Sequence, residues 1–175
     1  MRIIAGAWGG RRIQAPRGRD TRPTTDRIRE AWMSALGPRI PGARVLDLFA
    51  GSGALGLECL SRGAREAVLV ERARGALKAL RRNVEELEAG DRARIVAGDA
   101  WSYVQGLEVG AFDLALADPP YGEGFAARLL EHFDRTPFAA ELWVEHRTDE
   151  PLPELEGLRS RRYSDTSISI LESAE

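Results

Sequence analysis

Short hydrophobic runs alternate with segments of helical spacing from residue 43 onward. The runs have the length and the content of Val, Leu, Ile and Ala that buried strands have. The strands that they predict are Ala43–Phe49, Ala67–Glu71, Ala93–Ala97, Phe112–Ala117 and Glu141–Glu145. The helices that the spacing predicts between them are Ala54–Ser61, Arg74–Glu88, Ala100–Gln105 and Phe125–Phe133.

Strands that alternate with helices favour a parallel sheet covered on both faces, because each parallel strand needs a crossover connection. The chain therefore predicts an α/β fold with a doubly wound, mostly parallel sheet. Two further segments, Leu158–Tyr163 and Ser167–Glu172, alternate around the turn residues Ser164 and Asp165. The sheet is expected to end in this antiparallel hairpin, unlike most dinucleotide-binding domains.

The N-terminal residues follow a different pattern. Arg2–Ala7 and Arg11–Ala15 are expected to pair as a β-hairpin across a Gly-Gly turn. A helix is expected over Asp26–Leu36, with Thr24 or Thr25 as its N-cap. These elements predict a small appendage that packs on the α/β body.

Charge is distributed unevenly, although the formal net charge is only -2. Residues 1–44 hold ten arginines against three acidic residues, which leaves a net charge of -9 on the rest of the chain. A basic segment on an acidic body indicates that the segment faces a polyanion. We therefore expect two parts, a basic appendage over residues 1–42 and an α/β domain over residues 43–175.

The composition excludes several protein classes. Hydrophobic residues make up 43% and charged residues 30%, which argues against disordered, collagen-like and disulfide-rich chains. No apolar run approaches the roughly 18 residues of a membrane span, and no signal-peptide pattern opens the chain, so a cytoplasmic location is expected. Cys59 is the single cysteine, and His132 and His146 form no zinc pattern, so no disulfide and no metal are expected.

A glycine-rich segment, VLDLFAGSGALGLECL, joins the first strand to the next helix. Gly51, Gly53 and Gly56 have the spacing G-x-G-x-x-G, which permits a sharp turn and brings a ligand close to the helix N-terminus. Glu71 ends the second strand, where a carboxylate can bind ribose hydroxyls. These features predict a nucleotide-like ligand and fit either NAD or S-adenosylmethionine.

Acidic side chains around this loop distinguish the two ligands. Asp47 lies on the first strand, Glu71 ends the second, and Asp99 follows the third. Carboxylates repel a pyrophosphate, but they attract the ammonium and sulfonium groups of S-adenosylmethionine. The three acids favour S-adenosylmethionine and leave an NAD-dependent oxidoreductase as a distant alternative.

The fourth strand ends in Asp118, Pro119, Pro120 and Tyr121. Two prolines restrict this terminus, so the Asp118 carboxylate and the Pro119 carbonyl are two acceptors with little freedom. They can accept both hydrogens of an exocyclic amine while Tyr121 stacks on the base. We predict direct in-line methyl transfer to a nucleobase amine, without a covalent enzyme intermediate.

Two other methyl-transfer chemistries are disfavoured. C5 methylation of pyrimidines needs a cysteine nucleophile, and Cys59 lies in an apolar helix where a core role fits better. Ribose 2'-O-methyltransferases commonly use a catalytic lysine, and Lys78 lies on a charged outer helix. The amine therefore stays the predicted acceptor.

The order DLFAGSGALG, VLVER, GDA and DPPY resembles the class I S-adenosylmethionine-dependent methyltransferases that act on amino groups of bases. RIIAGAWGGRRI and TRPTTDRIREAW extend the resemblance, over nearly the whole chain, to bacterial 16S rRNA guanine-N2 methyltransferases of the RsmD type. The resemblance implies a Rossmann-like fold and methylation of the N2 amine of one guanine, guanine-966 in the family's rRNA convention, in the small ribosomal subunit. We also expect a monomer without membrane contact.

The resemblance also implies roles for single residues. The residues expected at S-adenosylmethionine are Asp47, Phe49, Ala50, Gly51, Gly53, Glu71, Arg72, Asp99 and Ala100. Among them, Glu71 is expected to hold the ribose hydroxyls and Asp99 the adenine amine. The catalytic residues expected at the target base are Asp118, Pro119, Pro120 and Tyr121. The sequence ERARGA departs from the pattern, because an acid often follows the glutamate there.

The basic appendage is expected to contact RNA. Its predicted RNA-binding residues are Arg2, Arg11, Arg12, Arg17, Arg19, Arg22 and Thr24. Spaced arginines bind phosphates without reading sequence, so selectivity is expected from RNA shape and a splayed base. Arg22, Pro23 and Thr24 are expected to close over the cofactor or the base.

Two alternatives stay open besides the oxidoreductase. One is a methyltransferase for adenine N6 or cytosine N4 in DNA or another RNA, although DNA enzymes usually carry a separate recognition domain. The other is a nucleotide-binding module that docks on RNA without catalysis, which an intact DPPY argues against.

Overall fold

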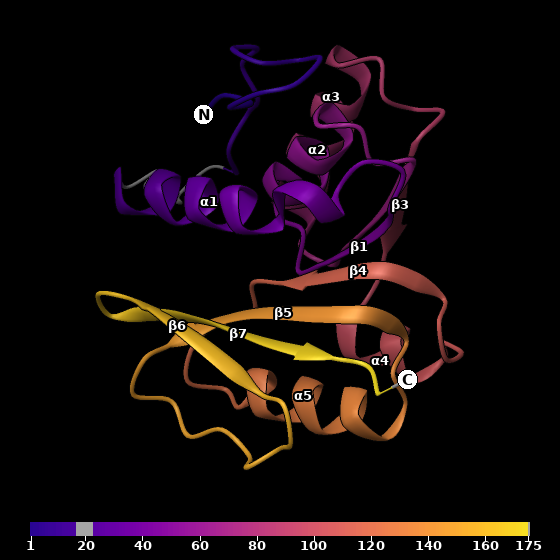
Figure 1. Ribbon diagram of the computed structural model, residues 1–175. Coiled ribbons are helices and arrows are strands. Elements are labelled where there is room, and N and C mark those ends of the chain that lie inside the picture. The colour runs from indigo at the N-terminus through magenta and orange to yellow at the C-terminus, as the bar shows by residue number, and fades with distance from the viewer. Residues whose placement is uncertain (17–22, 175) are drawn as a thin grey trace.

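The computed structural model describes residues 1–16 and 23–174, and for residues 23–25 it describes the backbone only. Within these ranges, seven strands form one sheet in the order β3-β2-β1-β4-β5-β7-β6. Figure 1 shows helices on both faces of this sheet. The predicted doubly wound, mostly parallel α/β fold is confirmed. No helix in the described part of the chain is long and apolar enough to cross a membrane.

The parallel part of the sheet contains five strands. Their bounds are β1 Arg44–Leu48, β2 Glu66–Glu71, β3 Ala93–Ala97, β4 Phe112–Ala117 and β5 Ala139–Arg147. Most positions of β1, β2 and β4 are buried, because helices cover both faces of a parallel sheet. All five predicted strands are present, and β5 is longer than expected because β7 pairs with it as far as Arg147.

The helices occur where the periodicity predicts them. Their bounds are α1 Pro23–Leu36, α2 Ala54–Ser61, α3 Arg74–Glu86, α4 Ala100–Gln105 and α5 Phe125–Arg135, with a short 3-10 turn at Gly37–Arg39 after α1. α3 ends before the expected Glu88, because Glu88 adopts a left-handed φ of 54° that a right-handed helix does not accommodate.

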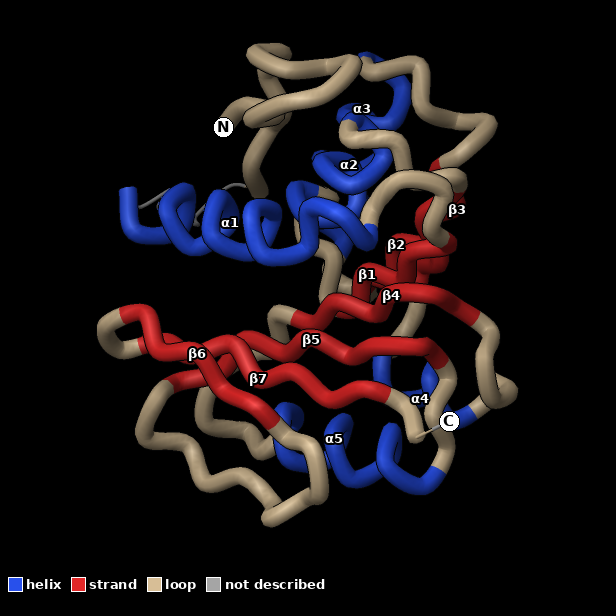
Figure 2. Tube along the Cα trace, viewed as in Figure 1, coloured by secondary structure: helices blue, strands red, loops and turns tan. Residues whose placement is uncertain are grey.

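Two hydrophobic cores lie on the two faces of the sheet. Figure 2 shows α1, α2 and α3 on one side of the strands and α4 and α5 on the other. The first core contains Trp32 of α1, Leu57 of α2 and Leu80 of α3, together with alternate side chains of the strands. The second contains Val104 of α4 and Phe133 of α5. Cys59 is fully buried in the first core, as its apolar surroundings predict.

The sheet ends in the expected antiparallel hairpin. β6 Arg159–Tyr163 pairs with β7 Thr166–Glu172, and β7 pairs antiparallel with β5. Ser164 takes a φ of 60° at the turn between the two strands. β7 is buried and β6 is an exposed edge rich in arginine, a composition that discourages pairing with other chains.

The N-terminal hairpin is smaller than predicted. Arg2 and Arg12 form a single antiparallel bridge, supported by Ile3 N–H donating to Arg11 O at 2.9 Å, and no strand forms in residues 1–16. The first strand of the hairpin is interrupted because its backbone binds α2 instead. The N–H groups of Ile4 and Ala5 donate to the buried carboxylate of Glu58 at 2.8 and 3.0 Å. A buried charge of this kind must be satisfied, so the segment turns towards it.

The predicted cap of the first helix is wrong. α1 begins at Pro23, so Thr24 and Thr25 lie in its first turn and neither is the N-cap. Proline suits this position because its missing N–H would have no partner in the first turn, and its φ is already helical. The periodicity of TTDRIREAW predicted the helix correctly, but it placed the first helical residue at Asp26, three residues after the observed start at Pro23.

Candidate active site

A cavity of about 220 Å³ opens at the carboxyl ends of the parallel strands. Its lining residues are Phe49, Val70, Glu71, Arg72, Ala73, Gly98, Asp99, Ala100, Asp118, Pro120 and Phe125. Ligands of doubly wound sheets bind at this edge, beside the point where the strand order reverses. β1 is that point here, with β2 on one side and β4 on the other. A more open hollow of about 530 Å³ beside Arg2 and Arg12 contains none of the predicted catalytic or cofactor residues.

The loop after β1 takes a conformation that depends on glycine. Gly51 has a φ of 59° and Gly53 a φ of 86°, both in the left-handed region. A Cβ on Gly53 would lie 2.5 Å from Cδ1 of Leu80, so a side chain does not fit. Phe49 has a φ of 59° despite its side chain, and its ring packs edge-on against Phe125 at 5.2 Å between centroids. A strained non-glycine residue on a cavity wall is typical of a binding site.

Asp47 lies beneath this loop and is 1% exposed. Its Oδ2 accepts a hydrogen bond from the Gly56 N–H at 2.9 Å. Burial raises the pKa of Asp47 to about 7, against the effect of that hydrogen bond, and the charges of Asp118 and Glu71 raise it further. Asp47 therefore does not line the cavity; it supports the glycine loop from behind.

Glu71 connects the glycine loop to the next helix. One carboxylate oxygen, Oε2, accepts from the Gly51 N–H at 2.8 Å, and Oε1 accepts from the N–H groups of Arg72 and Ala73, both at 2.8 Å. Because each carboxylate oxygen has two lone-pair sites, Oε2 keeps one for a further donor. The side chain is thus fixed by backbone groups and still able to accept from a ligand hydroxyl.

Asp99 caps a helix as well as lining the cavity. Its Oδ2 accepts from the Ser102 N–H at 2.9 Å at the start of α4, while Oδ1 lies 3.5 Å from the Arg72 guanidinium. The hydrogen bonds from Ser102 hold the pKa of Asp99 below its ordinary value, with a smaller contribution from Arg72. Asp99 is therefore an ionised acceptor at the cavity wall.

The segment after β4 forms the opposite wall. Asp118 and Pro120 line the cavity, whereas Pro119 is buried and supports them. Tyr121 lies outside the lining and is 44% exposed, yet its hydroxyl donates to Glu145 Oε1 at 2.6 Å. The pKa of Tyr121 is raised by burial of its hydroxyl and by the charge of Glu145. The hydroxyl is therefore a protonated donor.

The structure brings most of the predicted site together. Seven predicted residues line one cavity: Phe49, Glu71, Arg72, Asp99, Ala100, Asp118 and Pro120. Ala50, Gly51 and Gly53 shape the loop beside it without being part of its lining. Sequence reasoning missed the lining residues Val70, Ala73, Gly98 and Phe125, and it missed Glu145, which binds the Tyr121 hydroxyl. An acid at the end of the fifth strand was the available signal for Glu145, and nothing local marks Phe125.

The predicted RNA-binding arginines occupy different environments. Arg2 donates to Gly10 O at 2.7 Å and Arg11 donates to Glu86 O, so both bind backbone carbonyls. Arg12 is exposed. The remaining predicted residues cannot be placed in this way: Arg17, Arg19 and Arg22 lie outside the described residues, and the side chain of Thr24 is not described.

Comparison with known proteins shows similarity along nearly the whole chain. A family described as "Conserved hypothetical protein 95" matches residues 1–172. The chain is 36% identical over 180 residues to the putative rRNA methyltransferase YlbH of Bacillus subtilis, covering 97% of each protein. It is 38% identical over 157 residues to the ribosomal RNA small subunit methyltransferase D of Escherichia coli, covering 87% of this chain and 78% of that protein.

Solved structures agree with the sequence comparison. A putative methyltransferase from Escherichia coli superposes with a TM-score of 0.85 at 34% identity, covering 100% of this chain and 99% of that one. The similarity therefore includes the N-terminal segment and the C-terminal hairpin as well as the parallel sheet.

Proposed function

The chain belongs to the Conserved hypothetical protein 95 family, and from that membership and the cavity described above we propose that it methylates small-subunit rRNA. The methyl donor is S-adenosylmethionine, and the acceptor is the exocyclic N2 amine of one guanine, the family's guanine-966. Two relatives are named as rRNA methyltransferases, which supports the substrate class. The choice of guanine N2 rests on the resemblance of the motifs.

The residues present fit S-adenosylmethionine. Asp99 is an ionised acceptor on the cavity wall, and Glu71 has a lone pair left for a hydroxyl donor. We assign Glu71 to the ribose hydroxyls and Asp99 to the adenine amine, with the Gly51 loop against the methionine portion. When bound, the cofactor supplies an electrophilic methyl group on a sulfonium. Carboxylates on several sides of the cavity favour a cationic ligand over a pyrophosphate.

The wall after β4 fits the target base. The Asp118 carboxylate and the Pro119 carbonyl accept the two hydrogens of the amine and aim its lone pair, and Tyr121 stacks on the base. The new bond forms between the amine nitrogen and the methyl carbon as the carbon–sulfur bond breaks. The methylated nitrogen would then pass one proton to the Asp118 carboxylate and from there to solvent, leaving S-adenosylhomocysteine as the thioether product.

One observation carries the proposal: Glu71 and Asp99 of the cofactor motifs share one cavity with Asp118 and Pro120 of the DPPY motif. Motifs from the ends of three different strands therefore meet where a methyl group can pass between two ligands. A binding module without catalysis would not need the second motif at this cavity.

The basic appendage completes the proposal. We assign residues 1–42 to RNA phosphates, with residues 43–175 as the catalytic domain, and we propose a monomer that acts in the cytoplasm. The segment is fixed to α2 through Glu58, so phosphates bound there are held at a defined place relative to the domain.

Transfer of labelled methyl groups from S-adenosylmethionine tests the function. Undermethylated small subunits, naked 16S rRNA and DNA are compared, and the modified nucleotide is mapped. Label on a guanine N2 of the subunit or its RNA is the expected result. Label on adenine N6 or cytosine N4 would replace the proposal with the alternative amino-methyltransferase. Cofactor binding without transfer to any substrate would leave a docking module.

A further inference from the structure

Tyr121 is anchored at one end and accessible at the other. Its hydroxyl donates to Glu145 Oε1 at 2.6 Å, and Glu145 is only 9% exposed whereas Tyr121 is 44% exposed. A hydrogen bond from a hydroxyl to a carboxylate is short and strong. The ring is therefore held from inside the protein while part of it stays available to a partner, as a stacking surface requires.

Sheet register places Glu145 beside the reacting corner. Ala117 of β4 pairs with Val144 of β5, so Asp118 and Glu145 follow side by side on neighbouring strands. Residues in register point to the same face of a sheet. The Asp118 charge acts on Glu145 accordingly, and it is one of the causes that raise the pKa of Glu145.

The groups around Glu145 come from four elements. Asp118 follows β4, and Tyr121 lies in the turn after it. α1 contributes the indole N–H of Trp32, and β7 places the apolar Ile168 opposite Glu145. The Trp32 N–H is buried and forms no well-aligned hydrogen bond, but it favours the charged carboxylate. Among the residues that the structure describes, no arginine or lysine forms an ion pair with Glu145.

Burial and the Asp118 charge raise the pKa of Glu145 to about 7. The carboxylate is therefore ionised above that pH and carries a proton below it. A protonated Glu145 can still accept through its carbonyl oxygen, but the ionised carboxylate accepts from Tyr121 more strongly and has no donor of its own. The hold on the Tyr121 hydroxyl is thus strongest on the alkaline side of pH 7.

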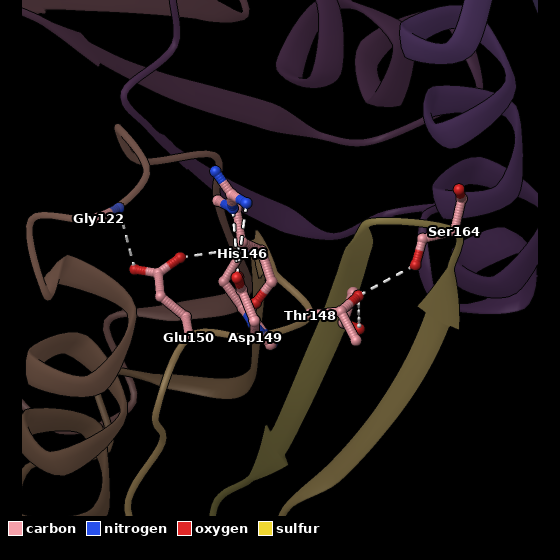
Figure 3. Close-up of polar contacts among 8 residues, drawn as sticks. Gly122, His146, Thr148, Asp149, Glu150 and Ser164 are labelled. Carbon is pink, nitrogen blue, oxygen red and sulfur yellow. Dashed lines mark hydrogen bonds and ion pairs between the residues drawn. The ribbon is translucent and has the colours of Figure 1, made fainter.

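A second carboxylate, Glu150 in the loop after β5, binds the turn that contains Tyr121. Figure 3 shows the Glu150 carboxylate reaching the Gly122 N–H, with Oε1 at 3.3 Å, and Oε2 accepts from the Arg147 N–H at 3.0 Å. In the same view, Thr148 contacts Ser164 at the tip of the β6–β7 hairpin. Glu150 fixes the backbone after Tyr121, whereas Glu145 fixes the Tyr121 side chain.

We propose that Glu145 is a positioning residue for methyl transfer, acting through the Tyr121 hydroxyl to hold the Tyr121 ring against the target base. The inference rests on the proposed function, since it takes the base to enter beside Asp118. Glu145 does not touch the reacting atoms. Its loss weakens capture of the base and leaves the chemical step largely intact.

Steady-state kinetics with undermethylated subunits test this role across about pH 5.5 to 8.5. In the wild type, KM for the subunit should rise several-fold as the pH falls through about 7. Glu145→Gln keeps an acceptor oxygen but no charge, so at pH 8 its KM should be roughly 5-fold higher, with kcat within about 2-fold. Its KM should also lose the pH dependence.

A double-mutant cycle shows whether the effect passes through the hydroxyl. Tyr121→Phe should raise KM as Glu145→Gln does, and the double variant should be no worse than the worse single variant. Additive effects would overturn the proposal, and so would a pH dependence of KM that survives in either single variant. Tyr121→Phe removes only the hydroxyl oxygen and leaves the carboxylate in place, so it gives the answer even if Glu145→Gln folds poorly.

Glu141→Gln is the matched control. Glu141 lies four residues earlier on β5 with the same orientation, but it accepts from Arg39 and Trp143 at the far end of the strand. It should keep the wild-type KM and its pH dependence. Equilibrium binding of S-adenosylmethionine should be equal in all variants. A wild type without transfer to any RNA would refute the proposed function, whereas an active wild type matched by Glu145→Gln would refute this role alone.

Discussion

The two halves of the cavity are built by different kinds of contact. In the cofactor half, each acid accepts from a backbone N–H of a nearby loop: Asp47 from Gly56, Glu71 from Gly51, and Asp99 from Ser102. In the target half, Tyr121 is held by the side chain of Glu145, 24 residues away on another strand. One half is fixed by hydrogen bonds from main-chain N–H groups, and in the other the Tyr121 ring is fixed by a hydrogen bond between side chains of distant elements.

This difference has a consequence for function. Backbone donors do not depend on the identity of their residue, so the cofactor half keeps its form as long as its acids and glycines remain. The target half depends on β5, β7 and α1, and α1 is itself part of the basic appendage, residues 1–42. Changes in the appendage can therefore reach Tyr121 through Trp32. They can also reach the glycine loop through Asn83, which accepts from the Gln14 N–H at 2.7 Å and donates to Ser52 O at 2.9 Å.

Asp118→Ala gives the largest expected effect, because it removes an acceptor for the amine and leaves the backbone contacts of the cofactor half in place. Turnover should fall about 10³-fold, the scale of one lost transition-state contact. Binding of S-adenosylmethionine, measured by titration calorimetry, should change by less than about 3-fold.

Asp113→Ala is the control for that variant. Asp113 lies on the same strand, and its Oδ2 accepts from the Arg44 N–H at the opposite end of the sheet. It should lose some stability and keep its turnover per folded molecule. Wild-type activity in Asp118→Ala would refute the role of Asp118, and a parallel loss of cofactor binding would show that the two halves are not separable.

The same contrast explains how far the sequence predicted the site. Gly51, Glu71 and Asp99 follow strands within a few residues, so periodicity and motif spacing located them together. Asp99 also caps the helix that follows it. The sequence did not reveal the role of Glu145, because that role depends on the register between β4 and β5, which a single sequence does not contain.

The prediction of a full hairpin in the N-terminal segment was wrong for a related reason. Its alternation predicted a hairpin, but the partner that decides its backbone conformation is Glu58 of α2, more than 50 residues away. A buried carboxylate with unfilled acceptor positions outweighs local strand preference. The α/β order itself was predictable, since each element there follows from its own periodicity.

Asp47→Asn tests the electrostatic cost of the cofactor half. The folded pKa is raised from 3.8 to about 7, so between these values the unfolded chain ionises while the folded protein keeps its proton. Stability therefore falls as the pH rises from about 4 to about 7, by up to about 4 kcal/mol. Asn at this position should remove that fall, as measured by urea unfolding at pH 4.5 and pH 8.

Glu145→Gln provides the comparison from the target half. The pKa of Glu145 is raised from 4.5 to about 7, a smaller shift than that of Asp47. Glu145→Gln should therefore remove a smaller part of the loss of stability with rising pH, up to about 3 kcal/mol. Equal pH dependence in wild type and Asp47→Asn would show that Asp47 ionises freely in the folded protein. Stability gained by Asp47→Asn should be accompanied by weaker cofactor binding, because the loop loses its charged support.

Gly56→Ala tests whether the cofactor half depends on close backbone approach. An added Cβ would lie 2.3 Å from Cδ2 of Leu69 and 3.1 Å from Asp47 Oδ2, so the buried Leu69 side chain, the strand below or the helix must move. The free energy of unfolding should fall by about 1–3 kcal/mol, and cofactor binding should weaken with it. Gly75→Ala is the control: Gly75 lies in α3 with open space around its Cβ position, so it should gain about 0.5–1 kcal/mol. A neutral Gly56→Ala would mean that the loop adapts more freely than its contacts indicate.

Arg12→Ala should have the smallest effect on RNA binding of these variants, and Arg12 belongs to neither the cofactor half nor the target half of the cavity. Arg12 is exposed on the appendage, where a phosphate contact contributes charge without base recognition. Losing one such contact should lower the slope of log K against log salt by about 0.7–0.9, with an equal loss for unrelated RNA sequences. Arg135→Ala, on α5 across the sheet, is the matched control and should leave the slope unchanged. If Arg12→Ala keeps the wild-type slope, Arg12 does not bind RNA. If it instead changes the pH dependence of KM, the appendage acts on Tyr121 through α1, and the target half extends as far as the N-terminus.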